Sequence, residues 1–477
     1  MLTSSYSSSR RILPQVYQCI LNSDYLAEEG LDLIDSIQSV DSWGDEEATF
    51  TERVAEMFLE AARGYGEGIS HLDNTLLQWI KALIDSSEKA GLQARLWCTR
   101  LPLEFYSKGK FTDGCEAAAE FLRDANFSPG GKITNNDNAQ AGFLRHMSVE
   151  YLTRDKNLSD RDEWEKRAKY IDVWKPLDPY NPSKLERYAQ GMGVRMRGKL
   201  AKDFGLFNEA YFSLKLFIEQ YAKRGSREDG WAIGDLGQVV LELEGADEDC
   251  DALSDLMTNG IRCGHDQLIP ELDARPCEVI TQIYSQAIES RMVARGSSSQ
   301  YDRDNVRESD TMFLEINRAA SILREGIFRP ERYAEAEQKL IGLKDRFENM
   351  LTMGALWHDN QTRHFSVLAY LAQISHLQMD WEVAQSRWIE TIDYGQSSVK
   401  EWNGDHYYVD VAKYSLANAQ LQAGGEPDAI IAELDEIVHR LNAEVVTWNL
   451  GLGTFWLEYI RKSMAEVMSV EESAREG

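Results

Sequence analysis

The stretch FSVLAYLAQISHLQMDWEVAQSRWIETIDYGQSS, from Phe365 to Ser398, decides the fold of this chain. Apolar and small residues recur in it at intervals of three and four, in two successive runs, which predicts two amphipathic helices joined by a tight turn. Small residues at Ala372 and Ala384 let the two helix backbones approach each other, and Trp388 fills the space toward the next unit. We therefore expect an antiparallel helix pair here.

The same pattern recurs along the chain, with one small residue at each expected helix crossing. The crossing residues are Gly114, Ala210, Ala252, Ala336, Ala384 and Ala429. Their positions differ by 42, 45 or 48, or by twice such a step, so the repeat is longer than the roughly 34 residues of a tetratricopeptide repeat. The pattern predicts an all-α fold: a right-handed α-solenoid of tetratricopeptide-like antiparallel helix pairs with long helices, and no strand-rich region.

Changes in composition divide the chain into five predicted segments. The run from 295 to 310 is rich in serine and charge, which is typical of a mobile loop, and the aromatic residues of GLGTFWLEYI (451–460) suit a covering for the last open face. The segments are 1–93, atypical helical repeats and a cap; 94–294, tetratricopeptide-like repeats; 295–310, the loop; 311–462, C-terminal repeats; and 463–477, an acidic tail.

Composition excludes several classes of function. With 51 Lys and Arg against 79 Asp and Glu, the net charge is −28, which disfavours binding to nucleic-acid phosphates and to anionic membrane surfaces. No apolar run approaches the roughly 18 residues of a membrane span. The six cysteines show no metal-ligand spacing. We expect a cytoplasmic or nuclear protein without a cofactor or a metal.

Three segments carry a resemblance to a known family: YNPSKLERYAQGMGVRMRGKLAKDFGLFNEA (180–210), LAYLAQISHLQMDWEVAQSRWIETIDYG (368–395) and GLGTFWLEYI. They resemble the tetratricopeptide-like helical proteins of filamentous fungi, over roughly residues 95–460. The chain is similar to stand-alone members, without the nucleotide-binding domain of fused ones. The resemblance implies an interaction or scaffold role and supplies no catalytic residue.

Candidate partner-binding residues follow from the repeat register. In a helix-pair solenoid the second, fifth, ninth and twelfth positions of the first helix of each pair point into the concave groove. In the unit that begins at 191 these positions include Arg195, Lys199 and Lys202, which we call the cationic strip. Such a strip suits capture of a partner's carboxylates. The alternative is that Asp203 and other acidic neighbours neutralise it.

In the unit that begins at Phe365, the ninth and twelfth positions are Gln373 and His376. His376, with His358 and His364, has the chemistry of a general base or a metal ligand. The spacing of these histidines fits no established metal motif, so structural histidines are the alternative.

The segment from Gly193 to Lys199 imitates the phosphate loop GxxxxGK. Leu200 follows in place of the Ser or Thr that holds magnesium, and no strand precedes the segment. The repeat register already explains both glycines, so we exclude a nucleotide site.

Two hypotheses about function remain. The first is a scaffold or adaptor that binds a protein or peptide segment in its concave groove, and an acidic partner would suit the cationic strip. The second is an enzyme of specialised metabolism, for example a cyclase, that uses the enclosed superhelix as a pocket for a small apolar molecule. Tryptophans crowd the C-terminal third, which suits either helix packing or such a pocket. The sequence shows no catalytic arrangement, and it favours the first hypothesis.

Overall fold

The computed structural model describes residues 90–105, 110–124, 133–150, 161–245, 250–263, 266–271, 273–295, 308–352, 358–397 and 407–425, together with 77, 78, 80, 81, 84, 85, 152, 456, 459, 460, 462 and 463. Most of the predicted N-terminal segment, loop and acidic tail lies outside the described residues, as does the crossing residue Ala429.

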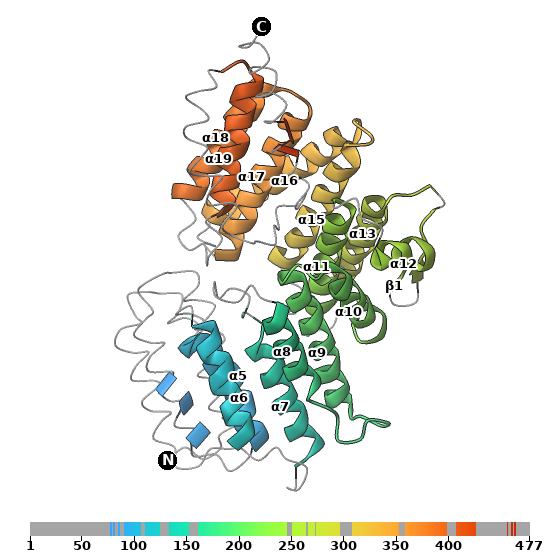
Figure 1. Ribbon diagram of the computed structural model, residues 1–477, viewed down its shortest axis with the longest axis vertical. Coiled ribbons are helices and arrows are strands. Elements are labelled where there is room, and N and C mark those ends of the chain that lie inside the picture. Colours follow the sequence, from blue (N-terminus) through green and yellow to red (C-terminus); the bar gives the residue numbers. More distant parts are fainter. Residues whose placement is uncertain are drawn as a thin grey trace. The chain divides into compact units, whose positions relative to one another are not determined.

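Within the described residues the chain forms helices, with one small hairpin of strands (Figure 1). The all-α class is therefore confirmed. The helices are α5 (Ala90–Glu104), α6 (Phe111–Asp124), α7 (Asn135–Ser148), α8 (Arg161–Asp172), α9 (Lys184–Asp203), α10 (Phe207–Gln220), α11 (Arg227–Gly245), α12 (Asp251–Asn259), α13 (Pro276–Arg295), α15 (Glu308–Gly326), α16 (Arg332–Thr352), α17 (His358–Leu377), α18 (Trp381–Ser397) and α19 (Tyr407–Gln422). The strands are β1 (Ile261–Cys263) and β2 (Asp266–Leu268), which pair antiparallel. Among the described residues, no helix is long and apolar enough to cross a membrane.

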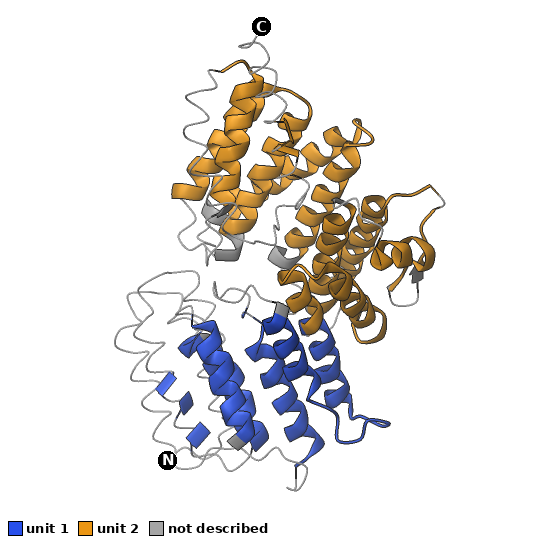
Figure 2. Cartoon of the chain, in the orientation of Figure 1, with its two compact units in different colours: residues 1–196 blue, residues 197–477 orange. Residues whose placement is uncertain are grey.

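The chain forms two compact units, residues 1–196 and 197–477, and the boundary falls inside α9 (Figure 2). In the first unit α7 packs against α5, α6 and α8. The Asn138 side chain donates a hydrogen bond of 2.9 Å to the Glu186 carboxylate, which joins α7 to α9. Gly193 lies under the buried ring of His146, and a Cβ at that glycine would lie only 2.7 Å from Nε2. The glycine thus lets two helices approach closely.

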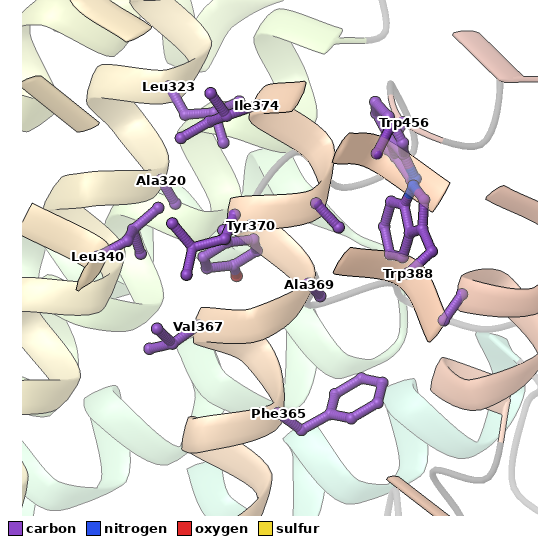
Figure 3. Close-up of a cluster of buried hydrophobic side chains, with 14 of the residues drawn as sticks. Ala320, Leu323, Leu340, Phe365, Val367, Ala369, Tyr370, Ile374, Trp388 and Trp456 are labelled. Carbon is purple, nitrogen blue, oxygen red and sulfur yellow. The ribbon is translucent and has the colours of Figure 1, made fainter. Parts of the chain in front are cut away.

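The second unit consists of helix pairs. We call α11, α15, α17 and α19 the first helices and α10, α13, α16 and α18 the second helices. Successive helices in this series pack against each other, and α15 also contacts both α11 and α17. A hydrophobic core cluster lies around α17, where Ile374 lies beside Leu323 of α15 and Trp388 packs beside Trp456 (Figure 3).

The first helices carry no fully exposed residue along the described part of their length. In 228–244, 311–326, 361–376 and 408–422 no residue is exposed. The second helices each have a solvent-facing stripe. A helix that is buried all round must bury its polar side chains as well, and these then need partners within the protein.

The backbone repeats its geometry at the turns after three of the helices. Gly205, Met379 and Gly424 all have positive φ, of 74°, 60° and 86°. Gly205 follows α9, Met379 follows α17 and Gly424 follows α19. Counting back six positions from these turns gives Lys199, Gln373 and Asn418, respectively. A residue in this left-handed conformation ends a helix and frees the chain to reverse direction. The three helices therefore share one register.

The expected regular spacing holds in part. Helices α15, α17 and α19 begin at Glu308, His358 and Tyr407, which are almost evenly spaced in the sequence. The spacing from α11, which begins at Arg227, to α15 is much longer, because α12 and the hairpin are inserted between α11 and its partner α13. Ala252, one of the expected crossing residues, is buried at the start of α12, which contacts both α10 and α11.

Candidate functional site

Two of the three residues of the cationic strip, Arg195 and Lys202, are buried, and Lys199 is partly exposed. Lys202 is 6% exposed, and its Nζ lies 2.5 Å from Asp235 Oδ1 and 3.0 Å from Gln238 Oε1, both on α11. Lys199 pairs with Asp203 at 3.3 Å. Arg195, in the other unit, is 2% exposed. The alternative from the sequence was that acidic neighbours neutralise these cations. Both lysines are indeed paired with carboxylates, Lys199 with Asp203 and Lys202 with Asp235.

The electrostatics of Lys202 support an internal role. Burial alone would lower the pKa of its ammonium group, but the carboxylates of Asp235 and Asp203 outweigh burial and raise the pKa. Lys202 is therefore charged at neutral pH and held by a buried ion pair. From Gln238 the contacts continue to Asn317 on α15, at 3.5 Å, so polar side chains connect α9, α11 and α15.

His376 is likewise part of the interior. Its Nε2–H donates to Asn418 Oδ1 at 2.8 Å, and its Nδ1 accepts from Trp388 Nε1–H at 3.3 Å. The rings of Trp381 and Trp456 meet it edge-on, with centroids 5.2 Å away. Burial lowers the pKa of His376 to about 4. A neutral imidazole with both nitrogens engaged ties three helices together and has no free position for a base or metal role.

Gln373 lies one turn before His376 on the same helix and is fully buried. Neither its Oε1 nor its Nε2 has a hydrogen-bond partner. Of the five predicted binding residues, Arg195, Lys202, Gln373 and His376 are buried, and Lys199 is partly exposed beside Asp203.

The unpaired amide of Gln373 leads to a prediction about stability. We expect Gln373→Met to raise the free energy of unfolding by about 1–3 kcal/mol, because it removes two buried groups that make no hydrogen bond and keeps the volume. Urea unfolding of the full chain measures this change. Gln396→Met, at an exposed position of α18, is the control, with a change within about 0.5 kcal/mol. A loss of stability at Gln373 would show that its amide is satisfied in solution.

The segment that imitates a phosphate loop lies inside α9, where the backbone is continuous helix from 184 to 203. Backbone N–H groups in a helix interior already bond to carbonyl oxygens and cannot surround a phosphate. Gly193 accommodates His146, and Gly198 accommodates Leu214. Both glycines therefore serve helix packing.

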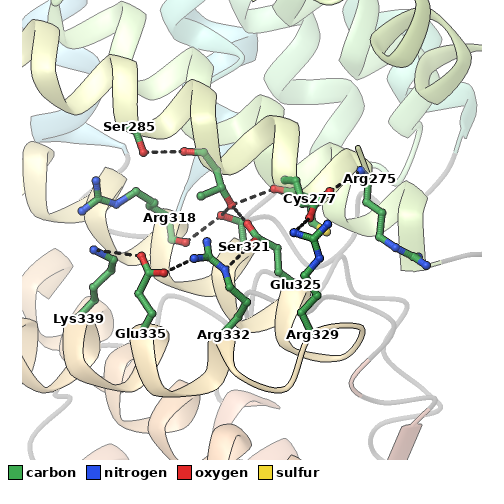
Figure 4. Close-up of polar contacts among 12 residues, drawn as sticks. Arg275, Cys277, Ser285, Arg318, Ser321, Glu325, Arg329, Arg332, Glu335 and Lys339 are labelled. Atoms are coloured by element: carbon green, nitrogen blue, oxygen red, sulfur yellow. Dashed lines mark hydrogen bonds and ion pairs between the residues drawn. The ribbon is translucent and has the colours of Figure 1, made fainter. Parts of the chain in front are cut away.

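A second polar cluster, which the sequence did not indicate, joins α13, α15 and α16 (Figure 4). Glu325 on α15 is 4% exposed; Thr281 Oγ1 lies 2.5 Å from its Oε1, and Arg332 Nε donates to its Oε2 at 2.7 Å. Burial raises the pKa of Glu325 despite these two partners. Arg332 also bonds Glu335, and Arg329 pairs with Glu278 at 2.8 Å.

The charged side chains of this cluster pair with one another: Arg332 with Glu325 and Glu335, and Arg329 with Glu278. Cys277 lies beside the cluster, and burial together with nearby carboxylates raises the pKa of its thiol, so it is not a nucleophile at neutral pH. No group of three or more His, Cys, Asp or Glu side chains suited to a metal ion occurs in the described part of the chain. The cluster therefore acts as a tie between helices. The sequence signal for it is weak, since its members come from separate helices that are distant in the chain.

Comparisons with family models, with curated proteins and with solved structures find no match to this chain.

Proposed function

We propose that this chain is a helical-repeat scaffold that binds a protein or peptide segment, as its tetratricopeptide-like pattern implies. The repeated helix pairs support this proposal, since stacked repeats create extended surfaces for contact with other chains. A solenoid path of these pairs, with a right-handed twist, is part of the same proposal.

One observation carries the proposal: the distribution of exposed apolar side chains. In the described helices of the second unit, all large apolar side chains exposed to solvent lie on second helices. They are Phe212, Leu216, Met292, Val293, Ile341, Val383 and Ile389. Exposed apolar side chains that recur on successive repeats suit a partner that runs across several helices. We therefore locate partner binding on the second helices instead of the cationic strip.

The paired state of Lys199 and Lys202 leaves an acidic partner without support, so the proposal does not specify the partner's charge. No specific observation favours the enzyme hypothesis. His376 bonds an amide and an indole, not a carboxylate, and the side chain of His358 lies outside the described residues.

The test is photo-crosslinking from the exposed stripe. We expect p-benzoylphenylalanine at Ile341 or Ile389 to give a covalent adduct of defined mass in source-cell extract, because both side chains are about half exposed, at 45% and 47%. The control places the same group at Glu348, an exposed polar position on α16. Adducts that are lost on adding Val383→Glu would support the proposal, and identical patterns from all three positions would contradict it.

A further inference from the structure

Two of the second helices, α16 and α18, lie side by side. Lys344 Nζ lies 2.5 Å from Glu390 Oε1, and Arg387 Nη2 lies 2.5 Å from Glu337 Oε1. Because these two ion pairs come in the same order along both helices, α16 and α18 run in the same direction. Their solvent-facing stripes therefore form one surface, which we call the α16–α18 face.

The repeat register places like side chains at equivalent positions of this face. Ile341 and Ile389 each lie five positions after the buried crossing alanine of their helix, and both are about half exposed, at 45% and 47%. Asp345 and Asp393 each lie four positions further on, and both are exposed. Four residues of a helix span about 6 Å. The face therefore carries a pair of aliphatic side chains and, one turn along, a pair of carboxylates.

The exposed charge on this face is negative. Within the described part of α16 and α18, all charged residues that are exposed are acidic, and they are Asp345, Glu348, Glu382, Glu390 and Asp393. The cations of the two helices are only partly exposed and pair with carboxylates of the same chain; they are Arg332, Lys339, Lys344, Arg346 and Arg387. A partner on this face meets aliphatic groups flanked by carboxylates, so cations on the partner complement it.

We propose that the α16–α18 face binds a lysine- or arginine-rich amphipathic helix of a protein partner. The aliphatic side of that helix covers Ile341 and Ile389. Cations four positions from its aliphatic residues meet Asp345 and Asp393, because positions i and i+4 of a helix are also about 6 Å apart. The same carboxylates repel acidic segments, nucleic-acid phosphates and anionic membranes. This inference rests on the proposed function, since it names the partner's chemistry at the same surface.

Three peptides that differ only in charge test this assignment. The cationic peptide is LKKLLKLLKKLLKL, and glutamine or glutamate replaces its lysines in the uncharged and the acidic peptides. By fluorescence anisotropy with the full chain, we expect the cationic peptide to bind at least about tenfold more tightly than the uncharged one, and the acidic one not to bind. The preference shrinks as salt rises from about 0.05 M to 0.5 M, because salt screens exposed charges.

Paired substitutions locate the binding. Asp345→Asn with Asp393→Asn, checked for folding by circular dichroism, is expected to weaken binding of the cationic peptide about fivefold, since each exposed ion pair contributes modestly. Glu116→Gln with Glu120→Gln, at exposed positions of α6 in the other unit, removes the same charge and should leave the affinity within about twofold. Equal weakening by the two double variants would show a response to net charge alone and would overturn the inference.

Ile341→Ser with Ile389→Ser separates this inference from the proposed function. We expect this double variant to weaken binding of the cationic peptide about tenfold, through loss of the apolar contacts. Equal binding of all three peptides that is lost in this variant would overturn the cationic partner and leave partner binding on the second helices supported. No binding of the cationic peptide would overturn the inference alone, because photo-crosslinking in extract decides the proposed function separately.

Discussion

We expect Lys202→Met to lower the free energy of unfolding by about 3–5 kcal/mol, because it leaves Asp235 buried without its cation. The 2.5 Å contact and the low exposure of both side chains, 8% and 12%, are the basis of this expectation. Methionine retains most of the lysine's apolar stem, so the loss reports the charge pair. Denaturant unfolding of the full chain, followed by circular dichroism, measures it.

Lys199→Met is the matched control. Lys199 lies on the same helix and pairs with Asp203, but its side chain is 21% exposed and both partners reach solvent. We expect a change within about 1 kcal/mol for such a pair. Similar small effects of both substitutions would mean that Lys202 is not held in the interior.

Acid should destabilise the protein through its buried neutral histidines. Burial lowers the pKa of His364 and His376 to about 4 and that of His146 to about 3, from 6.5. The folded state therefore binds fewer protons than the unfolded state below pH 6.5. The stability from each histidine is complete above that pH and is lost as pH falls toward its folded pKa, by about 3 kcal/mol each for His364 and His376.

Asp229 acts in the opposite direction, because burial raises its pKa to about 6 from 3.8.

Substitution of His376 isolates the contribution of this histidine to the pH dependence of unfolding. His376→Gln should reduce the slope of unfolding free energy against pH, between pH 4.5 and 6, by about 1.4 kcal/mol per pH unit, the value for one proton. Parallel curves for wild type and variant would show that His376 is protonated equally in both states.

The helix pairs were predictable because their signal is local. The intervals of three and four residues from Phe365 onward correspond to α17 and α18, and the crossing residues Ala210, Ala336 and Ala384 are fully buried. Ala252 is also fully buried, on α12, which contacts α11. The hairpin that follows α12 was not predicted. Gly264, which stands between the two strands in the sequence, is a signal that favours a turn there.

The candidate site was less predictable, because exposure depends on contacts between segments far apart in the chain. Lys199 and Lys202 both pair with Asp203, and Gln373 and His376 are both buried on α17. The register assumed that α9 and α17 each leave one face open. Instead, Asp235 of α11 contacts Lys202 of α9, and Asn418 of α19 contacts His376 of α17.

The central claim is that Lys202, one of the predicted groove cations, bonds Asp235 and Gln238 on the neighbouring helix α11 of its own chain. A double-mutant cycle of Lys202→Met and Asp235→Asn tests this claim most directly, with unfolding free energies of the wild type, both single variants and the double variant. We predict a coupling free energy of about 2–3 kcal/mol between the two residues. A coupling below about 0.5 kcal/mol, the limit expected for independent sites, would contradict the account and leave Lys202 available to a partner.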